Sequence, residues 1–234
     1  MLWGCLRLNL NVQRMQKVVG TSTTWSTQSF VGLFKQRNIR LMLMVAVIVR
    51  LLRIYPDIDQ FSLTCTPMEK AETTVRLIRS QGYERLMIFC NTKYMCQRLT
   101  DDFRRAGLDA DCIHGDIRQS QREKTMQRFR DGKLAILIAT DVASRGIDVD
   151  DVDCVINYDI PDENEYYVHR VGRTGRAKRK GVAWSIVSNF PEKAKLDEIC
   201  KFCQFTVTPM TLSLEGTLAA EEVKAPTPPK RRFR

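Results

Sequence analysis

Strand and helix signals alternate along the chain from Asp57 onward, and this alternation limits the fold more than any other feature of the sequence. Short apolar runs of strand length, such as Leu86–Cys90 and Leu134–Ala139, are separated by longer polar segments with helical features. Parallel strands need such crossover segments, which are usually helices. The sequence therefore predicts an α/β fold in three layers, with a parallel sheet flanked by helices.

The bounds of the expected elements follow from apolar runs, helix starts and helix stops. Thr66–Glu69 and Ser120–Glu123 both have the pattern of a capping box and predict helix starts. Gly82, Gly107 and Gly132 follow helical segments, where glycine commonly ends a helix. We expect strands over 58–65, 86–90, 110–113, 134–139, 154–157 and 182–187, and helices over 66–81, 93–105, 120–132, 162–170 and 191–203.

The distribution of charge divides the chain at Asp57. Residues 1–56 hold eight Lys and Arg and no Asp or Glu. The other 29 of the 37 basic residues and all 27 acidic residues lie in 57–234, where their charges nearly balance. The net charge of +10 thus comes mainly from the leader and favours a polyanionic partner such as nucleic acid. We expect a basic, partly helical leader over 1–56, one domain over 57–214, and a disordered basic tail over 215–234.

The leader leaves several interpretations open. Its apolar run over 41–49 is shorter than the roughly 20 residues needed to cross a bilayer, and no signal-peptide pattern is present, so we expect no membrane span. An arginine-rich, acid-poor leader is compatible with an organelle transit peptide. A non-homologous start from a truncated or frame-disrupted gene is the hypothesis we favour, and a helix packed on the domain is a third.

The eight cysteines do not form the pattern of a secreted disulfide framework. Cys90, Cys112 and Cys154 lie in or beside apolar runs, where cysteine is usually a small buried hydrophobe. Cys200 and Cys203 form a single C-x-x-C pair without a second pair at zinc spacing, so packing is the expected role and no metal site is predicted. This cysteine usage fits a reducing cytoplasm.

Residues 169–176, His-Arg-Val-Gly-Arg-Thr-Gly-Arg, place three arginines at a regular spacing of three with glycines between them. Guanidinium groups present donors that match phosphate oxygens, and glycine lets the backbone approach a ligand closely. Alone, the pattern fits an ordinary basic turn as well as a phosphate site. Four other segments accompany it: Ile88–Lys93, Ile113–Asp116, Ala139–Asp148 and Val155–Pro161.

In this order and spacing the five segments closely resemble the C-terminal RecA-like domain of DEAD-box RNA helicases, from about Asp57 to about Leu214. The last motif begins with a histidine, as in the DEAD-box branch of these helicases. Related helicase branches usually have glutamine at this position. The resemblance implies the RecA-like fold of P-loop NTPases, without a P-loop of its own. It also implies ATP-dependent RNA helicase ancestry.

The resemblance further implies roles for single residues. Arg173 and Arg176 match the catalytic arginine fingers at the γ-phosphate of ATP, and Asp148 matches the residue that binds the ribose. The nucleotide-binding positions it implies are Gly146, Asp148, His169 and Arg170. The RNA-binding positions it implies are Asn91, Thr92, Gly115, Asp116, Arg122, Thr140 and Arg145.

Several of these residues also have simpler interpretations. Thr92 and Thr140 precede helical segments and fit helix caps as well as phosphate donors. Arg122 fits a solvated helix face, and Asp148 fits a turn. Polar residues that follow parallel strands lie at one edge of the sheet, where ligands bind in open α/β folds. We therefore expect the segments after 86–90, 110–113 and 134–139 to meet on one surface.

The 234 residues contain no G-x-x-x-x-G-K-[S/T] and no Asp-Glu-Ala-Asp motif, which in the family lie in an N-terminal RecA-like domain. We expect ATP and Mg²⁺ to bind only in a complete two-domain helicase, with the N-terminal domain in trans, and this chain to be inactive in ATP hydrolysis alone. RNA, bound through its backbone independently of sequence, is the expected partner. The alternatives are a stand-alone RNA-binding module or a remnant of a disrupted gene.

Overall fold

The computed structural model describes residues 58–144, 149, 152–175 and 180–221. The predictions for the leader and for most of the tail lie outside the described residues. So do four of the expected site residues: Arg145, Gly146, Asp148 and Arg176.

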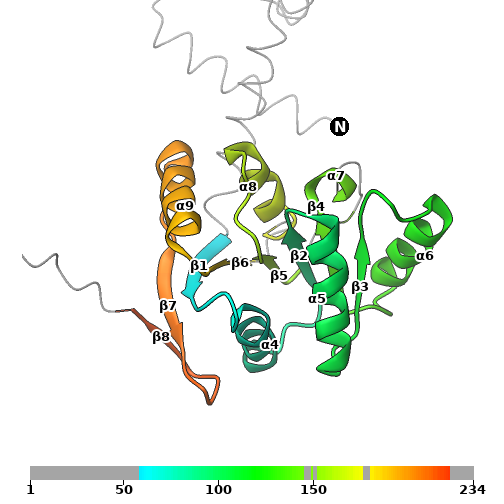
Figure 1. Cartoon of the computed structure of the whole chain (residues 1–234), viewed down its shortest axis with the longest axis horizontal. Coiled ribbons are helices and arrows are strands. Elements are labelled where there is room, and N and C mark those ends of the chain that lie inside the picture. The colour runs from blue at the N-terminus through cyan, green and yellow to red at the C-terminus, as the bar shows by residue number, and fades with distance from the viewer. Residues whose placement is uncertain (1–57, 145–148, 150–151, 176–179, 222–234) are drawn as a thin grey trace, which may run out of the picture. The chain divides into compact units, whose positions relative to one another are not determined.

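The described strands form one eight-stranded sheet in the order β3-β4-β2-β5-β6-β1-β7-β8 (Figure 1). Every neighbouring pair is parallel except β7 and β8, which form an antiparallel hairpin at one edge. The strands are β1 (Ile58–Thr64), β2 (Leu86–Cys90), β3 (Ala110–Ile113), β4 (Ile136–Thr140), β5 (Cys154–Asn157), β6 (Gly181–Val187), β7 (Thr208–Leu212) and β8 (Leu218–Ala220).

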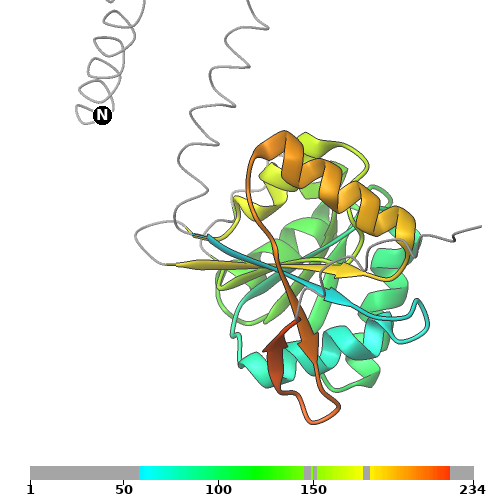
Figure 2. The same cartoon turned by 90° about the vertical axis from the view of Figure 1, so that its left-hand side faces the viewer.

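Helices cover both faces of the sheet, which confirms the predicted three layers (Figures 1 and 2). One face carries α4 (Lys70–Gln81) and α5 (Lys93–Arg105). The other carries α6 (Gln119–Arg130), α7 (Asp141–Ser144), α8 (Asn164–Val171) and α9 (Phe190–Cys203). Successive strand residues point to opposite faces, so Ile88 packs with the α4 and α5 core, whereas Phe89 packs with the α6 core.

The helix ends were predicted better than the helix starts. Gly82, Gly107 and Gly132 all have positive φ, as a glycine that ends a helix requires. One bond of the first expected capping box forms, because the Glu69 N–H donates to the Thr66 hydroxyl at 3.3 Å. That hydroxyl donates to the Glu69 carboxylate at 2.7 Å, and the pair closes a turn before α4, which begins only at Lys70. The second prediction, for 120–123, was wrong because α6 begins at Gln119 and no side chain caps it.

The sheet extends beyond the expected domain boundary at residue 214. Strands β7 and β8 were missed, since they are short and only partly buried. Gly216, with φ of 85°, lies in the turn between them, and Met210 pairs with Ala220. The first residues of the predicted disordered tail therefore form a sheet edge. Within the described residues, no helix combines the length and apolar character needed to cross a membrane.

Candidate functional site

Polar residues gather where the parallel strands end. Asn91 follows β2, Gly115 and Asp116 come after β3, and Thr140 ends β4. Because β2, β3 and β4 pair in parallel, these residues lie at the same edge of the sheet, as the sequence predicted. We call this the carboxyl edge, formed by Asn91, Thr92, Gly115, Asp116 and Thr140 together with Arg122 of α6.

Arg170 is buried and supports the carboxyl edge through Asn91. It comes from α8, whose Tyr167, Val168 and Val171 pack into the core, and its own side chain is only 1% exposed. Its Nε and Nη2 donate to the two oxygens of Asp141 at 2.7 and 2.6 Å, an ideal bidentate pair.

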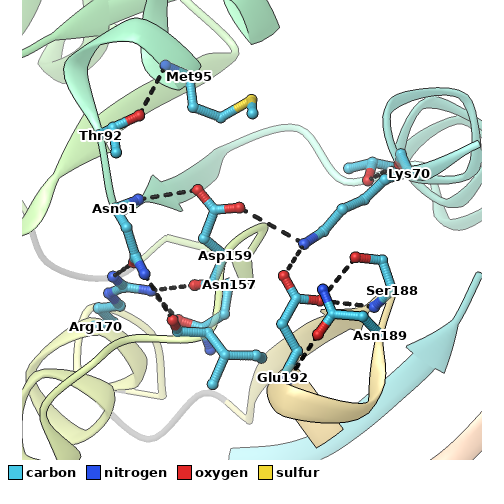
Figure 3. Close-up of polar contacts among 12 residues, drawn as sticks. Lys70, Asn91, Thr92, Met95, Asn157, Asp159, Arg170, Ser188, Asn189 and Glu192 are labelled. Carbon is cyan, nitrogen blue, oxygen red and sulfur yellow. Dashed lines mark hydrogen bonds and ion pairs between the residues drawn. The ribbon is translucent and has the colours of Figure 1, made fainter. Parts of the chain in front are cut away.

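The remaining donors of Arg170 reach two more strand ends. Nη2 also donates to Asn91 Oδ1 at 2.8 Å, and Nη1 donates to the Asp159 carbonyl at 2.6 Å and to Asn157 Oδ1 at 3.4 Å (Figure 3). One guanidinium thus joins the ends of β2, β4 and β5. Since all its nitrogens are engaged inside the protein, Arg170 positions these loops, and direct contact with a nucleotide would break bonds shown here.

Asn91 is held from three directions. Its Nδ2 donates to the Ile160 carbonyl at 2.8 Å and its Oδ1 accepts from Arg170, while its backbone N–H donates to Asp159 Oδ2 at 3.0 Å (Figure 3). Its side chain is therefore committed to the loop itself. Asn91 therefore fixes the backbone that leads into Thr92, and its own amide group is not available to a ligand.

Thr92 and Thr140 both cap helices, as one interpretation of the sequence expected. The Thr92 hydroxyl accepts the Met95 N–H at 3.1 Å at the start of α5, and the Thr140 hydroxyl accepts the Ala143 N–H at 3.4 Å at the start of α7. A capping hydroxyl uses its oxygen and keeps its proton as a donor. Capping therefore leaves each threonine its hydroxyl proton. Thr92 is exposed and can donate to a phosphate, whereas Thr140 is only 8% exposed.

Gly115 and Asp116 lie exposed in the turn after β3. Lys93, from the start of α5, donates to the Asp116 carboxylate at 2.6 Å. This hydrogen bond lowers the pKa of Asp116 below its ordinary value, with a smaller contribution from the charge of Lys93 and the nearby His114. The pair keeps the β2 and β3 loops next to each other at the surface.

Arg122 is not simply solvated, which was one interpretation of its position. Its Nη2 donates to the carbonyl of Ala143 at 2.6 Å and so ties α6 to the end of α7. The side chain is half-buried, and its other donors have no partner among the residues that the structure describes. Those donors remain available to an anion at the carboxyl edge.

Arg173 lies on a second surface. Residues 173–175, which we call the arginine loop, follow α8 and are fixed near the beginnings of β5 and β6. The Arg173 carbonyl accepts the Val152 N–H at 3.2 Å, and the Thr174 hydroxyl donates to the Val152 carbonyl at 2.5 Å. Val152 precedes β5, so the arginine loop lies toward the opposite end of the strands from the carboxyl edge.

Close packing of glycines fixes the other side of the arginine loop. Gly175 has φ of 70°, and a Cβ added to Gly181 would lie 2.4 Å from the Gly175 nitrogen. Only glycine at position 181 allows β6 to begin this close to the loop. His169 is exposed on α8 between the two surfaces, and Arg173 is half-buried.

Neither metal chemistry nor disulfides account for these contacts. No group of three or more His, Cys, Asp or Glu suited to a metal ion occurs among the described residues. The described cysteines are free thiols; burial raises the pKa of Cys90 and Cys154, and burial raises the pKa of Cys200 to about 11. These thiols are therefore protonated near neutral pH.

Sequence reasoning missed the residues that support the site. Asp141, Asn157 and Asp159 lie within the recognised segments but were given no role, and Lys70 and Glu192 lie outside those segments. Asn157 could have been noticed in the sequence, because it ends an apolar run that was expected to be a strand. An amide at such a position is buried with the strand, as Asn157 is, and needs a polar partner. The sequence gives no such signal for Lys70 and Glu192, which are 122 positions apart.

Comparison with known proteins agrees with this geometry. Residues 69–178 match the helicase conserved C-terminal domain. The structure is similar to that of the C-terminal domain of the DEAD-box protein Dbp5, with 32% identity and a TM-score of 0.62 over 66% of this chain and 91% of that one. The chain belongs to the DEAD-box RNA helicase family. The expected family and RecA-like fold are thus confirmed.

Another relative, DeaD, and a longer structure of Dbp5 show what share of a DEAD-box protein the match covers. The ATP-dependent RNA helicase DeaD of Buchnera aphidicola is 45% identical over 134 residues, which are 57% of this chain and 22% of DeaD. Saccharomyces cerevisiae Dbp5 bound to RNA and ADP BeF3 is 31% identical with a TM-score of 0.63, over 66% of this chain and 42% of Dbp5. The chain therefore spans less than half of either DEAD-box protein.

Proposed function

We propose that this DEAD-box domain acts as the C-terminal half of an ATP-dependent RNA helicase. Its carboxyl edge holds the RNA backbone, and its arginine loop presents Arg173, with Arg176, to the γ-phosphate of ATP bound against an N-terminal RecA-like domain. The observation that carries the proposal is the network of Arg170, which fixes the ends of β2, β4 and β5 as one donor-bearing edge.

The donors of the carboxyl edge suit the sugar-phosphate backbone of RNA and would not read its base sequence. Thr92, Thr140 and Arg122 offer hydroxyl and guanidinium donors, which bind phosphate and sugar oxygens without distinguishing bases. In this proposal Arg145 adds a further guanidinium. The likeness to Dbp5, which is bound to RNA in its solved structure, supports the same partner for this chain.

The arginine loop suits a phosphate. The backbone of Arg173 is bonded on both sides, its N–H to the Arg170 carbonyl at 3.1 Å and its carbonyl to Val152. Such preorganisation lets a guanidinium stabilise developing negative charge without moving during the reaction. In the complete helicase Gly146 and Asp148 would contact the nucleotide and its ribose, and the other domain would hold Mg²⁺ and position water.

Helix α8 connects the two surfaces. Arg170 near its end binds the carboxyl edge, and the Arg170 carbonyl accepts the N–H of Arg173 in the arginine loop. A shift of the RNA-binding loops would move Arg170, and Arg170 is bonded directly to Arg173, three residues further along the chain. In this proposal His169 and Arg170 couple RNA binding to the nucleotide site.

RNA binding is tested by fluorescence anisotropy with a labelled single-stranded oligonucleotide. We expect the combined change of Arg122→Ala and Arg145→Ala to weaken binding and to reduce its salt dependence, since each lost phosphate contact lowers the salt slope by about one. The control combines Arg98→Ala and Arg105→Ala, which remove the same charge from exposed positions on α5. Equal losses in both double variants would refute a specific RNA track.

The role of Arg173 is tested by ATP turnover. We expect no turnover by the purified chain alone, and RNA-stimulated turnover after fusion to the N-terminal RecA-like domain of a DEAD-box relative. Arg173→Ala in the fusion should reduce the rate by at least about 10³-fold, the effect of removing an arginine finger. RNA-stimulated turnover by the unfused chain that Arg173→Ala abolishes would overturn the proposed dependence on a second domain.

A stand-alone RNA-binding module is the second candidate. It is favoured by the completeness of the carboxyl edge, whose contacts all form within one domain. In that case the chain binds RNA with the same affinity whether or not ATP and an N-terminal domain are present. A helicase half instead binds RNA more tightly in the presence of both.

A further inference from the structure

A chain of polar contacts runs from α9 to Asn91, and Lys70 lies at its centre (Figure 3). Lys70 is the first residue of α4 and its side chain is 6% exposed. Its Nζ donates to Glu192 Oε1 of α9 at 2.7 Å and lies 3.6 Å from Asp159 Oδ1, beyond β5. The same ammonium lies 5.0 Å from the centre of the Tyr158 ring.

Each carboxylate extends the chain with its second oxygen. Glu192 Oε2 accepts both the N–H and the hydroxyl of Ser188, at 2.7 and 2.9 Å, just after β6. Asp159 Oδ2 accepts the backbone N–H of Asn91 at 3.0 Å. The first turn of α9, the end of β6 and the loop after β2 are therefore linked through one ammonium group.

Removing the charge of Lys70 would leave the negative charges of Glu192 and Asp159 without their shared cation. Two carboxylates with about a fifth of their side-chain surface exposed share this one cation. Without it they would be left partly buried and unpaired, which is unfavourable for a charged group. Asp159 would then turn toward water, and the Asn91 N–H would lose its acceptor.

We propose that Lys70 is a positioning residue for RNA binding, which holds the Asn91–Thr92 loop in place from α9 by pairing with Glu192 and Asp159. Its ammonium is buried, so its effect on RNA passes through Asp159 and Asn91. The effect on RNA rests on the function proposed above, whereas the effect on the loop rests on the contacts alone.

The effect on the loop is tested by amide hydrogen exchange of the full chain without RNA. Lys70→Met should reduce the protection of the Asn91 amide about tenfold relative to core amides such as that of Leu137, because a hydrogen bond to a charged acceptor is lost. Lys70→Arg keeps a buried cation and should restore most of this protection. A proportional loss at Asn91 and Leu137 in Lys70→Met would mean a general loss of stability and would overturn the proposal.

A matched control and a second variant complete the exchange experiment. Lys195→Met removes a lysine of α9 whose 3.0 Å ion pair is with Glu198 and with none of the residues of the Lys70 cluster, so Asn91 protection should not change. Glu192→Gln should reduce Asn91 protection in the same direction as Lys70→Met, and it serves if Lys70→Met does not fold. If Glu192→Gln leaves the Asn91 amide unchanged, α9 does not support the loop.

The effect on RNA is tested by anisotropy with the same variants and a single-stranded oligonucleotide. Lys70→Met should weaken binding several-fold, with recovery in Lys70→Arg and no change in Lys195→Met. If the parent chain binds no RNA, the function proposed above fails while the exchange experiment still judges the loop. If Asn91 loses protection but RNA affinity is unchanged, Lys70 supports the loop and the proposed role in RNA binding is wrong.

Discussion

At the scale of single residues, the site depends on side chains whose donors and acceptors are nearly all committed. Arg170 uses every guanidinium nitrogen to join three loops, and Asn91 uses both polar atoms of its amide. Among the described residues of the carboxyl edge, Thr92 and Arg122 keep donors at the surface, and Thr140 keeps a hydroxyl proton beneath it. In the proposed function, these committed side chains form a fixed support beneath the donors that would contact RNA.

Arg170→Met is expected to destabilise the chain by about 3 to 5 kcal/mol, because it leaves the Asp141 carboxylate partly buried without its partner. Urea unfolding followed by circular dichroism measures the change. Arg105→Met serves as the control, since the Arg105 side chain is 75% exposed and surface pairs contribute less than about 1 kcal/mol. Similar losses for both variants would mean that the Arg170 network contributes no more than a surface ion pair.

Lys93→Met is expected to raise the pKa of Asp116 toward its ordinary value, because the Lys93 hydrogen bond is the main cause of the lowering. A lowered pKa means that the pair stabilises the fold above the unfolded pKa and loses this effect as the pH falls through the folded pKa. Both side chains are exposed, so the effect on stability is small. Carbon-detected NMR titration measures the pKa of Asp116, with Lys124→Met as the control. An unchanged Asp116 pKa in Lys93→Met would show that the Lys93–Asp116 hydrogen bond is not the cause of the lowering.

At the scale of elements, the parallel strands bring the functional loops together, and local side chains set their details. The buried runs and the three glycines that end helices made most of the strands and several helix bounds predictable from sequence. The starts of α4 and α6 were not predictable. The Thr66–Glu69 pair closes a turn before α4 and does not begin that helix. In α6, Gln119 already lies inside the helix and its side chain donates to Glu123 at 2.8 Å.

Gly181→Ala is expected to destabilise the protein by about 1 to 3 kcal/mol, since overpacking against the backbone of the arginine loop forces a shift. The same change should displace Arg173 and lower the turnover of the two-domain fusion. Gly115→Ala is the stability control, because a Cβ there has no neighbour within 4 Å. Thermal unfolding compares the two, and an unchanged melting temperature for Gly181→Ala would show that the close approach is not required.

At the scale of the whole molecule, the candidate site residues that the structure describes lie on two surfaces of one domain. The sequence motifs identified the segments, and the parallel topology placed Asn91, Asp116 and Thr140 at one edge. They did not reveal that Arg170 faces inward or that Lys70 meets Glu192, because those contacts depend on how α4, α8 and α9 pack on the sheet. The motifs predicted candidate residues, whereas packing determines which of the described candidates are accessible.

The central claim is that the carboxyl edge is the RNA-binding surface, and an NMR titration of the chain with a single-stranded RNA oligonucleotide tests it most directly. We predict that amide shifts concentrate at Thr92, Gly115, Asp116, Arg122 and Thr140, and that added salt reverses them because the contacts are to phosphate. The β7–β8 hairpin should show no change. Shifts concentrated on that hairpin, or none at the carboxyl edge while the RNA is bound, would contradict the account.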